Sequence, residues 1–147
     1  MTLCTEELRT LELFKMLPDE RLEWVCDRVT QVKISQGEIL VSEGDTARGL
    51  FILMSGKIAI TRYSDGVEMP LGQHTAPEFV GEIPILTDEP ILVNLRALDD
   101  CRVYELPRED FLELLPLSRK FEITIFRAGQ TSLRGLESFI RYREKMA

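Results

Sequence analysis

The residues best suited to chemistry in this 147-residue chain lie in the stretch FVGEIPILTDEPILVNLRA, residues 79–97. Gly81 and Glu82 stand at a predicted chain reversal, and a short helix is expected after them. Backbone N–H groups at such a turn can hold a phosphate. A bound phosphate is also expected to meet a cation, yet the residue after Pro90 is Ile91. The segment therefore has the shape expected of a phosphate site without its charge.

Other chemistry has little support in the sequence. Cys4, Cys26 and Cys101 are far apart and form no CxxC pair, so we predict reduced or buried thiols and neither a disulfide framework nor a zinc site. The single histidine, His74, falls in the loop-like stretch LGQHTAPE and is predicted to be a surface residue. No nucleophile elbow is present. We therefore predict no catalytic residue, no metal site and no enzymatic activity in these residues.

Composition and charge further restrict the class of protein, its location and its partners. The length fits one domain, and 44% hydrophobic against 29% charged residues is ordinary for a globular protein. No apolar run approaches a membrane span, and the start lacks the layout of a signal peptide, so a cytoplasmic location is expected. The net charge is −7, with an acidic body over 1–118 and an excess of basic residues only over 119–147. An acidic body does not attract nucleic acid.

Hydrophobic spacing divides the chain into three parts. Residues 1–31 have helical spacing interrupted by Pro18, which predicts a helical cap. Residues 32–106 consist of short apolar and β-branched runs separated by glycine turns, typical of an all-β barrel or sandwich. The clearest hairpin is YSDGVEM, because Asp65-Gly66 tolerates the positive φ angles of a tight turn.

The helical period returns over 107–147. REDFLELL predicts a short helix, Pro116 interrupts it, and a long helix is expected from there to the end. Apolar residues at heptad-like steps predict a dimerisation seam on that helix. The members of this seam are Phe126, Leu133, Leu136 and Ile140. The alternative is that the same residues pack back on the chain's own barrel.

This order of elements, together with three glycine-containing motifs, resembles the cyclic nucleotide-binding domain family over about residues 13–115. The motifs are QGEILVSEGD, LFILMSGKIAI and FVGEIPILTDEP. The resemblance implies an α+β fold: a β-barrel or jelly roll of about eight strands with N-terminal helices, a hinge helix and a long C-terminal helix. It identifies 79–97 as similar to the phosphate-binding cassette of that family.

In the family, the cassette glycine presents N–H groups to the cyclic phosphate, and the glutamate accepts the ribose 2′-hydroxyl. An arginine directly after the proline pairs with the phosphate. Here that position holds Ile91. By resemblance, the ligand-binding positions of this chain are Gly81, Glu82, Ile83, Ile91, Leu92, Val93 and Asn94.

The resemblance implies cAMP or cGMP as ligand, whereas the substitution at Ile91 predicts lost or weakened affinity. Arg96 is expected on the opposite face of an extended run and is a poor substitute, and Asn94 could offer only one neutral hydrogen bond. Without the arginine, we favour Glu82 as a cap of the cassette turn. Three hypotheses stay open: a cyclic nucleotide receptor with an unusual anchor, a receptor for a less charged ligand, and a ligand-free dimerisation or docking scaffold.

A second resemblance concerns the C-terminal residues. LESFIRYREKMA is similar to the segment that enters the phosphoacceptor helix of sensor histidine kinases. It implies a regulatory sensor domain that precedes a kinase domain in the same chain and forms a homodimer through the long helix. The helix-turn-helix of the family's transcription factors does not occur within these 147 residues.

Overall fold

The computed structural model of this protein describes residues 3–129 and 144. Three helices come first: α1 (Leu3–Leu8), α2 (Glu12–Lys15) and α3 (Asp19–Arg28). The strands are β1 (Thr30–Ile34), β2 (Ile39–Val41), β3 (Gly49–Ser55), β4 (Lys57–Ser64), β5 (Val67–Thr75), β6 (Glu78–Val80), β7 (Asn94–Ala97) and β8 (Cys101–Pro107). The remaining elements are α4 (Glu82–Thr87), α5 (Arg108–Leu114), the 3₁₀ helix η1 (Leu115–Leu117) and α6 (Arg119–Gly129).

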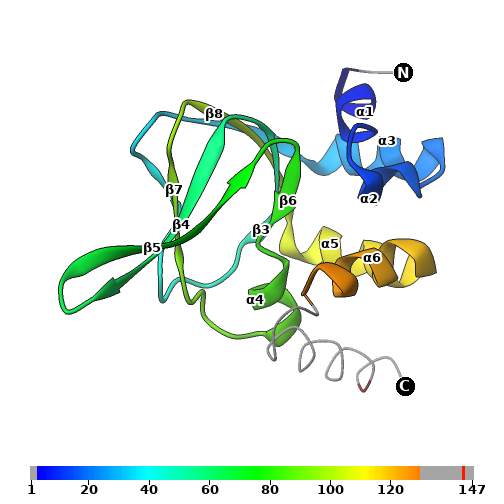
Figure 1. Ribbon diagram of the computed structural model, residues 1–147. Coiled ribbons are helices and arrows are strands. Elements are labelled where there is room, and N and C mark those ends of the chain that lie inside the picture. The colour runs from blue at the N-terminus through cyan, green and yellow to red at the C-terminus, as the bar shows by residue number, and fades with distance from the viewer. Residues whose placement is uncertain (1–2, 130–143, 145–147) are drawn as a thin grey trace.

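The strands form two antiparallel four-stranded sheets, in the orders β1-β8-β3-β6 and β2-β7-β4-β5. This arrangement confirms the predicted jelly roll of about eight strands. Helices α1–α3, α5 and α6 gather on one side of it, and the β4–β5 hairpin projects on the other (Figure 1). Strand β3 is buried from Gly49 to Leu53 because one face points into the barrel and helices cover the other. The strand therefore links the barrel interior to the helical layer.

Tight turns connect β3 to β4 and β4 to β5. Asp65 and Gly66 adopt φ angles of 51° and 80° between β4 and β5, as expected for the predicted primed turn. Gly56 separates β3 from β4 with a φ of 94°. A Cβ atom at Gly56 would lie 2.7 Å from the carbonyl oxygen of Asp100, so this turn needs glycine both for its angle and for its space.

As predicted, a helix begins directly after Pro18. Asp19 and Glu20 lie in the first turn of this helix, α3. The helix is also interrupted between α1 and α2, which the hydrophobic spacing did not predict. In this turn, the hydroxyl of Thr10 donates a hydrogen bond to the carbonyl oxygen of Glu7 at 2.6 Å. A side chain that bonds its own backbone in this way competes with helix continuation.

The cysteine prediction was wrong for one pair. Cys4 of α1 and Cys26 of α3 form a disulfide, with their Cα atoms 6.0 Å apart, whereas Cys101 is a buried free thiol. Sequence spacing could not reveal the pair because the packing of α1 on α3 brings the two residues together. The disulfide joins the first helix of the cap to the third.

The C-terminal helices continue directly from β8. Helix α5 covers most of REDFLELL, and Pro116 lies in η1, as predicted. Helix α6 buries Phe121, Ile125 and Phe126, so Phe126 belongs to the protein's own core, with only 2% of its surface exposed. This placement favours the alternative in which Phe126 packs on its own domain, and its part in a dimerisation seam stays a prediction. The other three seam residues, Leu133, Leu136 and Ile140, lie outside the described residues.

Among the described residues, no helix is both long and apolar enough to cross a membrane.

Candidate ligand-binding site

A cavity of about 460 Å³ lies at the end of the barrel next to α4. Its walls come mainly from β3, β6, the first turn of α4 and the segment 90–95, with single residues from β2, β4, β5 and the loop before β3. Most of the lining is apolar, including Phe51 of β3 and Phe79 of β6. The size falls within the range of roughly 300–1,000 Å³ that is typical of small-molecule sites.

Six of the seven positions predicted by resemblance line this cavity. They are Gly81, Glu82, Ile83, Ile91, Leu92 and Val93. Gly81 takes a φ of 92°, and a Cβ there would lie 3.3 Å from the Phe51 ring, so the turn into α4 requires glycine. The fold therefore gathers the predicted cassette residues around one space.

Asn94 is the exception, because it does not line the cavity. It is 2% exposed, and its side chain is engaged with Glu43: Asn94 Oδ1 accepts from the Glu43 backbone N–H, and Nδ2 donates to the Glu43 carboxylate, both at 3.0 Å. These bonds anchor β7 to the loop after β2. The amide is therefore occupied by structure and turned away from a ligand.

Ile91 occupies the position where the resemblance calls for arginine. Its backbone is fixed on both sides: its N–H donates to the carbonyl oxygen of Asp45 at 2.9 Å, and its own carbonyl oxygen accepts from Gly44 at 2.8 Å. The residue is 7% exposed and lines the cavity. An apolar side chain is thus held where a phosphate would need a cation.

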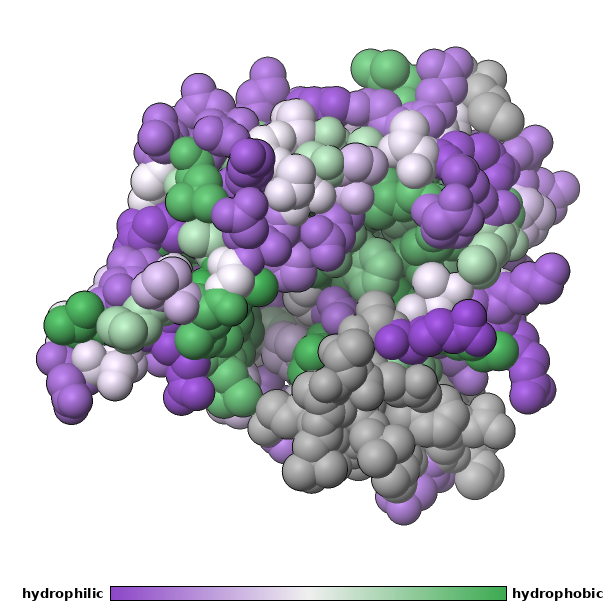
Figure 2. Space-filling model, viewed as in Figure 1, coloured by the Kyte–Doolittle hydropathy of each residue, from purple (hydrophilic) through white to green (hydrophobic). Residues whose placement is uncertain are grey.

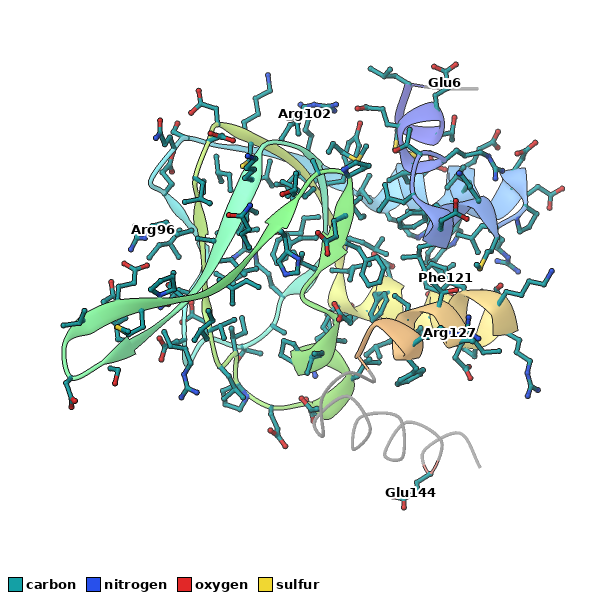
Figure 3. All side chains as sticks on the ribbon, in the orientation of Figure 1. Glu6, Arg96, Arg102, Phe121, Arg127 and Glu144 are labelled. Carbon is teal, nitrogen blue, oxygen red and sulfur yellow. A yellow bond between two sulfur atoms is a disulfide. The ribbon has the colours of Figure 1, made fainter. Side chains whose placement is uncertain are left out.

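None of the described lining residues is lysine or arginine. Two arginines close in sequence to lining residues, Arg96 and Arg48, form ion pairs with glutamates. Arg96 lies at the outer edge of the barrel (Figure 3), where its Nε is 2.9 Å from Glu68 Oε1. Arg48 pairs with Glu105 at 2.7 Å. The expectation that Arg96 does not replace the missing arginine therefore agrees with its position.

The ionisable side chains that line the cavity are His74, Glu78 and Glu82. His74 Nδ1 lies 2.9 Å from Glu78 Oε1. This histidine was predicted as a surface loop residue, but it lies in β5 and is only a quarter exposed. A strand was difficult to predict at this position, because the preceding residues Gly72 and Gln73 are not typical of strands.

Burial raises the pKa of the Glu82 carboxyl above its ordinary value. A hydrogen bond from its own backbone N–H and the proximity of His74 act in the opposite direction, and Glu78 adds to the rise. The bond to the backbone N–H agrees with the hypothesis that Glu82 supports the turn into α4. Its place in the lining also leaves it facing any bound ligand.

The arrangement is that of a binding pocket with apolar walls and one acidic corner. It can accept hydrogen bonds and enclose an apolar group. The described lining offers no lysine or arginine that would attract an anion.

Comparison with known proteins agrees with the fold. The family described as "Cyclic nucleotide-binding domain" matches residues 31–116. The cAMP-dependent protein kinase regulatory subunit of Emericella nidulans is 31% identical over 110 residues, which cover 75% of this chain and 26% of that protein. Human cGMP-dependent protein kinase 2 is 28% identical over 107 residues, covering 71% and 14%. The chain thus spans about a quarter or less of these relatives.

Solved structures show the same fold. The sensor domain of the transcriptional regulator DNR from Pseudomonas aeruginosa aligns with a TM-score of 0.78 at 18% identity, covering 86% of each chain. A regulatory subunit of a cAMP-independent protein kinase A from Trypanosoma cruzi, bound to guanosine, aligns with a TM-score of 0.76 at 18% identity, covering 97% of this chain and 50% of that one. With more than half of its residues matched by the family, this chain belongs to the cyclic nucleotide-binding domain family.

Proposed function

We propose that this chain is a regulatory sensor domain whose pocket has weakened affinity for cyclic nucleotides and whose occupancy is passed to α5 and α6. The single observation that carries the weakened affinity is the lining of the pocket. Ile91 stands where the family's phosphate-binding arginine is expected, and the described lining holds no other arginine or lysine.

The size of the expected effect follows from the missing charge pair. Removing one partner of a buried ion pair typically costs about 3–5 kcal/mol. That corresponds to a loss of affinity of roughly a hundred- to several-thousandfold. The only carboxyl groups in the described lining, those of Glu78 and Glu82, cannot replace that cation.

A ligand without a phosphate is the second candidate, and the apolar wall formed by Ile91, Leu92 and Val93 favours it. A nucleoside would keep the ribose hydroxyls that can donate to Glu82 and would lack the phosphate, for which the described lining offers no lysine or arginine. The Trypanosoma cruzi structure with guanosine shows that the fold occurs with a nucleoside bound. Adenosine and guanosine are therefore the first phosphate-free compounds to test.

The route from the pocket to the helices begins at Arg108. This first residue of α5 donates to the carboxylate of Asp88, which ends α4, and to the carbonyl oxygen of Ala47 at 3.3 Å. Ala47 lines the pocket. Movement of α4 or of the Ala47 loop on ligand binding would therefore act directly on the start of α5.

The route continues through aromatic contacts. Phe111 of α5 lies 6.5 Å from Phe121 of α6, between ring centroids. Both residues are fully buried. A shift of α5 would thus re-seat α6, which is a two-state coupling of the kind that allostery requires. We place the boundary of this output unit at residue 107.

In the whole protein, we propose that the residues beyond α6 join two copies and deliver the signal to a kinase, either in the same chain or as a separate subunit. The kinase-linked relatives and the likeness of the C-terminal residues to histidine kinases support this. A cytoplasmic location agrees with such a role.

The test is a calorimetric titration of the purified chain with cAMP, cGMP, adenosine and guanosine at near-physiological salt. We expect a nucleoside to bind more tightly than either cyclic nucleotide. Saturable micromolar binding of cAMP or cGMP would overturn the proposed loss of affinity. Absence of heat with all four compounds up to millimolar concentration would favour the ligand-free scaffold over a nucleotide or nucleoside sensor.

A further inference from the structure

The cysteines of the helical cap lie apart from the pocket and have a geometry suited to redox chemistry. Cys4 and Cys26 are half-buried, and their Cα atoms are 6.0 Å apart, within the usual range for a disulfide. Neither residue lines the barrel pocket. The free thiol, Cys101, is 4% exposed, and burial raises its pKa, so it is a poor competitor for oxidation.

We propose that Cys4 and Cys26 are a reversible oxidation site, at which a small disulfide oxidant such as oxidised glutathione closes the link between α1 and α3 and thereby tightens the support beneath α5 and α6. The proposal does not depend on any ligand of the barrel pocket.

The cap has contacts that hold it in place without the disulfide, which a reversible site requires. Leu8 of α1 is fully buried. Glu7 accepts hydrogen bonds from Arg102 and from the Tyr104 hydroxyl, the latter at 2.7 Å. Helix α1 therefore remains docked on β8 when the thiols are reduced, and the two sulfur atoms stay close enough to react again.

The cap also contacts the C-terminal helices, so a change in its redox state can affect α5 and α6. Two residues after Cys26, Arg28 Nε lies 3.7 Å from Asp110 Oδ1 of α5. Phe14 of α2 lies 5.9 Å from Phe121 of α6, between ring centroids. Figure 1 shows the cap and the C-terminal helices side by side. Fixing α1 to α3 would therefore restrict the surface on which α5 and α6 rest.

The reaction is a two-step thiol–disulfide exchange. One cysteine thiolate attacks a sulfur of oxidised glutathione, forming a mixed disulfide and releasing one glutathione thiolate. The second cysteine thiolate then displaces the other glutathione. Two electrons pass from the cysteine pair to glutathione, which leaves as two reduced molecules, and the two cysteine protons go to solvent or to the leaving thiolates.

The experiment equilibrates the full chain in buffers of varied reduced-to-oxidised glutathione ratio, followed by denaturing alkylation and mass spectrometry. We expect a two-electron titration in which two cysteines become protected together and Cys101 stays alkylated. Cys4→Ser and Cys26→Ser should each abolish the internal disulfide, whereas Cys101→Ser should leave the titration unchanged. A pair that stays oxidised in every buffer, or that never forms, would overturn the proposal.

Two further readouts test the effect on structure. Trp24, the only tryptophan, has the Arg28 guanidinium 3.9 Å from its ring centroid, so its fluorescence should follow the titration. The oxidised form should melt about 10 °C higher, and the α5 and α6 amides should exchange more slowly. A complete titration with unchanged α5 and α6 exchange would refute the tightening of these helices.

Discussion

Arg108, the first residue of α5, donates a hydrogen bond to the carboxylate of Asp88, the residue that ends α4. The pair joins the pocket helix to the hinge helix by side chains alone. The Asp88 side chain is 67% exposed, so the pair adds little to overall stability. Together with the bond from Arg108 to the carbonyl oxygen of Ala47, it connects the pocket walls to the helices that follow.

Arg108→Ala should therefore lower the free energy of unfolding by no more than about 1 kcal/mol, in line with exposed ion pairs. At the same time, hydrogen exchange at the start of α5 should become faster, because the helix loses its tie to Asp88 and Ala47. The control is Arg62→Ala, on the exposed face of β4. Unchanged α5 exchange in Arg108→Ala would remove this residue from the proposed route.

Restoring the cation should restore cyclic nucleotide binding. We expect Ile91→Arg to raise the affinity for cAMP or cGMP at least about a hundredfold, because it supplies the missing partner of the phosphate. The measurement is the same calorimetric titration. Leu98→Arg is the matched control, since it adds an equal charge at an exposed position outside the pocket. Equal gains in both variants would point to a general charge effect and against a local anchor.

The half-buried carboxyl group of Glu82 should make stability depend on pH. Its pKa is raised in the folded state, so its contribution is fully present below the unfolded value near 4.5 and is lost as pH rises through the folded pKa. Glu82→Gln should therefore gain stability over the wild type as pH rises from 4.5 toward 8, by denaturant unfolding. The same change at the exposed Glu113 should produce no comparable trend. A pH-independent difference for Glu82→Gln would contradict the assignment.

The opposite pH trend is expected for Glu7. Its hydrogen bond with Arg102 is the main cause of a lowered pKa, so its contribution is present above about 4.5 and is lost as pH falls through the folded pKa. Glu7→Gln should cost about 1–3 kcal/mol at pH 7, and the difference should shrink in acid. Glu6→Gln is the control, because this neighbouring glutamate is exposed (Figure 3). Equal losses in both variants would show that the pairing adds nothing specific.

The turn at Gly56 offers a test of packing. Gly56→Ala should destabilise the protein by several kcal/mol, because a Cβ would meet the Asp100 carbonyl oxygen at 2.7 Å and Cys101 Sγ at 2.6 Å. Gly66→Ala has a similar positive φ but open space around the added carbon, so it should cost only about 1–2 kcal/mol of backbone strain. Thermal melts of the two variants separate the clash from the strain. Similar melting temperatures for the two variants would contradict an added cost of the clash at Gly56.

Local features of the fold could be predicted from the sequence, because their causes are local. The turn at Asp65-Gly66 and the helix start after Pro18 depend on the conformational preferences of the residues themselves. The positions around Gly81 and Ile91 followed from the family resemblance, and the pocket lining includes both.

The features that were missed depend on tertiary packing. The Cys4–Cys26 pair forms only when α1 packs on α3, and His74 reaches the pocket only because β5 pairs with β4 in a specific register. Phe126 has the spacing of a dimer seam, but spacing cannot say whether a helix face covers its own domain or a partner. In each case the deciding neighbour is distant in the sequence.

One group of exposed apolar residues lies on the β4–β5 hairpin. Figure 2 shows green surface near the hairpin, which carries the exposed residues Tyr63, Val67, Met69 and Leu71. Strand β5 is also the edge of its sheet, and Pro70 within it removes one N–H donor from that edge. A missing donor on an exposed edge discourages pairing with a strand of another molecule.

The pairing of β1 with β8 has a consequence for how the protein is made. Thr30 lies opposite Glu105, so the first strand of the barrel finds its partner only in the last. During synthesis, β1 must wait as an unpaired strand until nearly the whole barrel has left the ribosome. Contacts so distant along the chain form late and slowly. Assembly of this domain should therefore be limited by closure of the barrel ends, with β1 and its apolar neighbours exposed to chaperones until that moment.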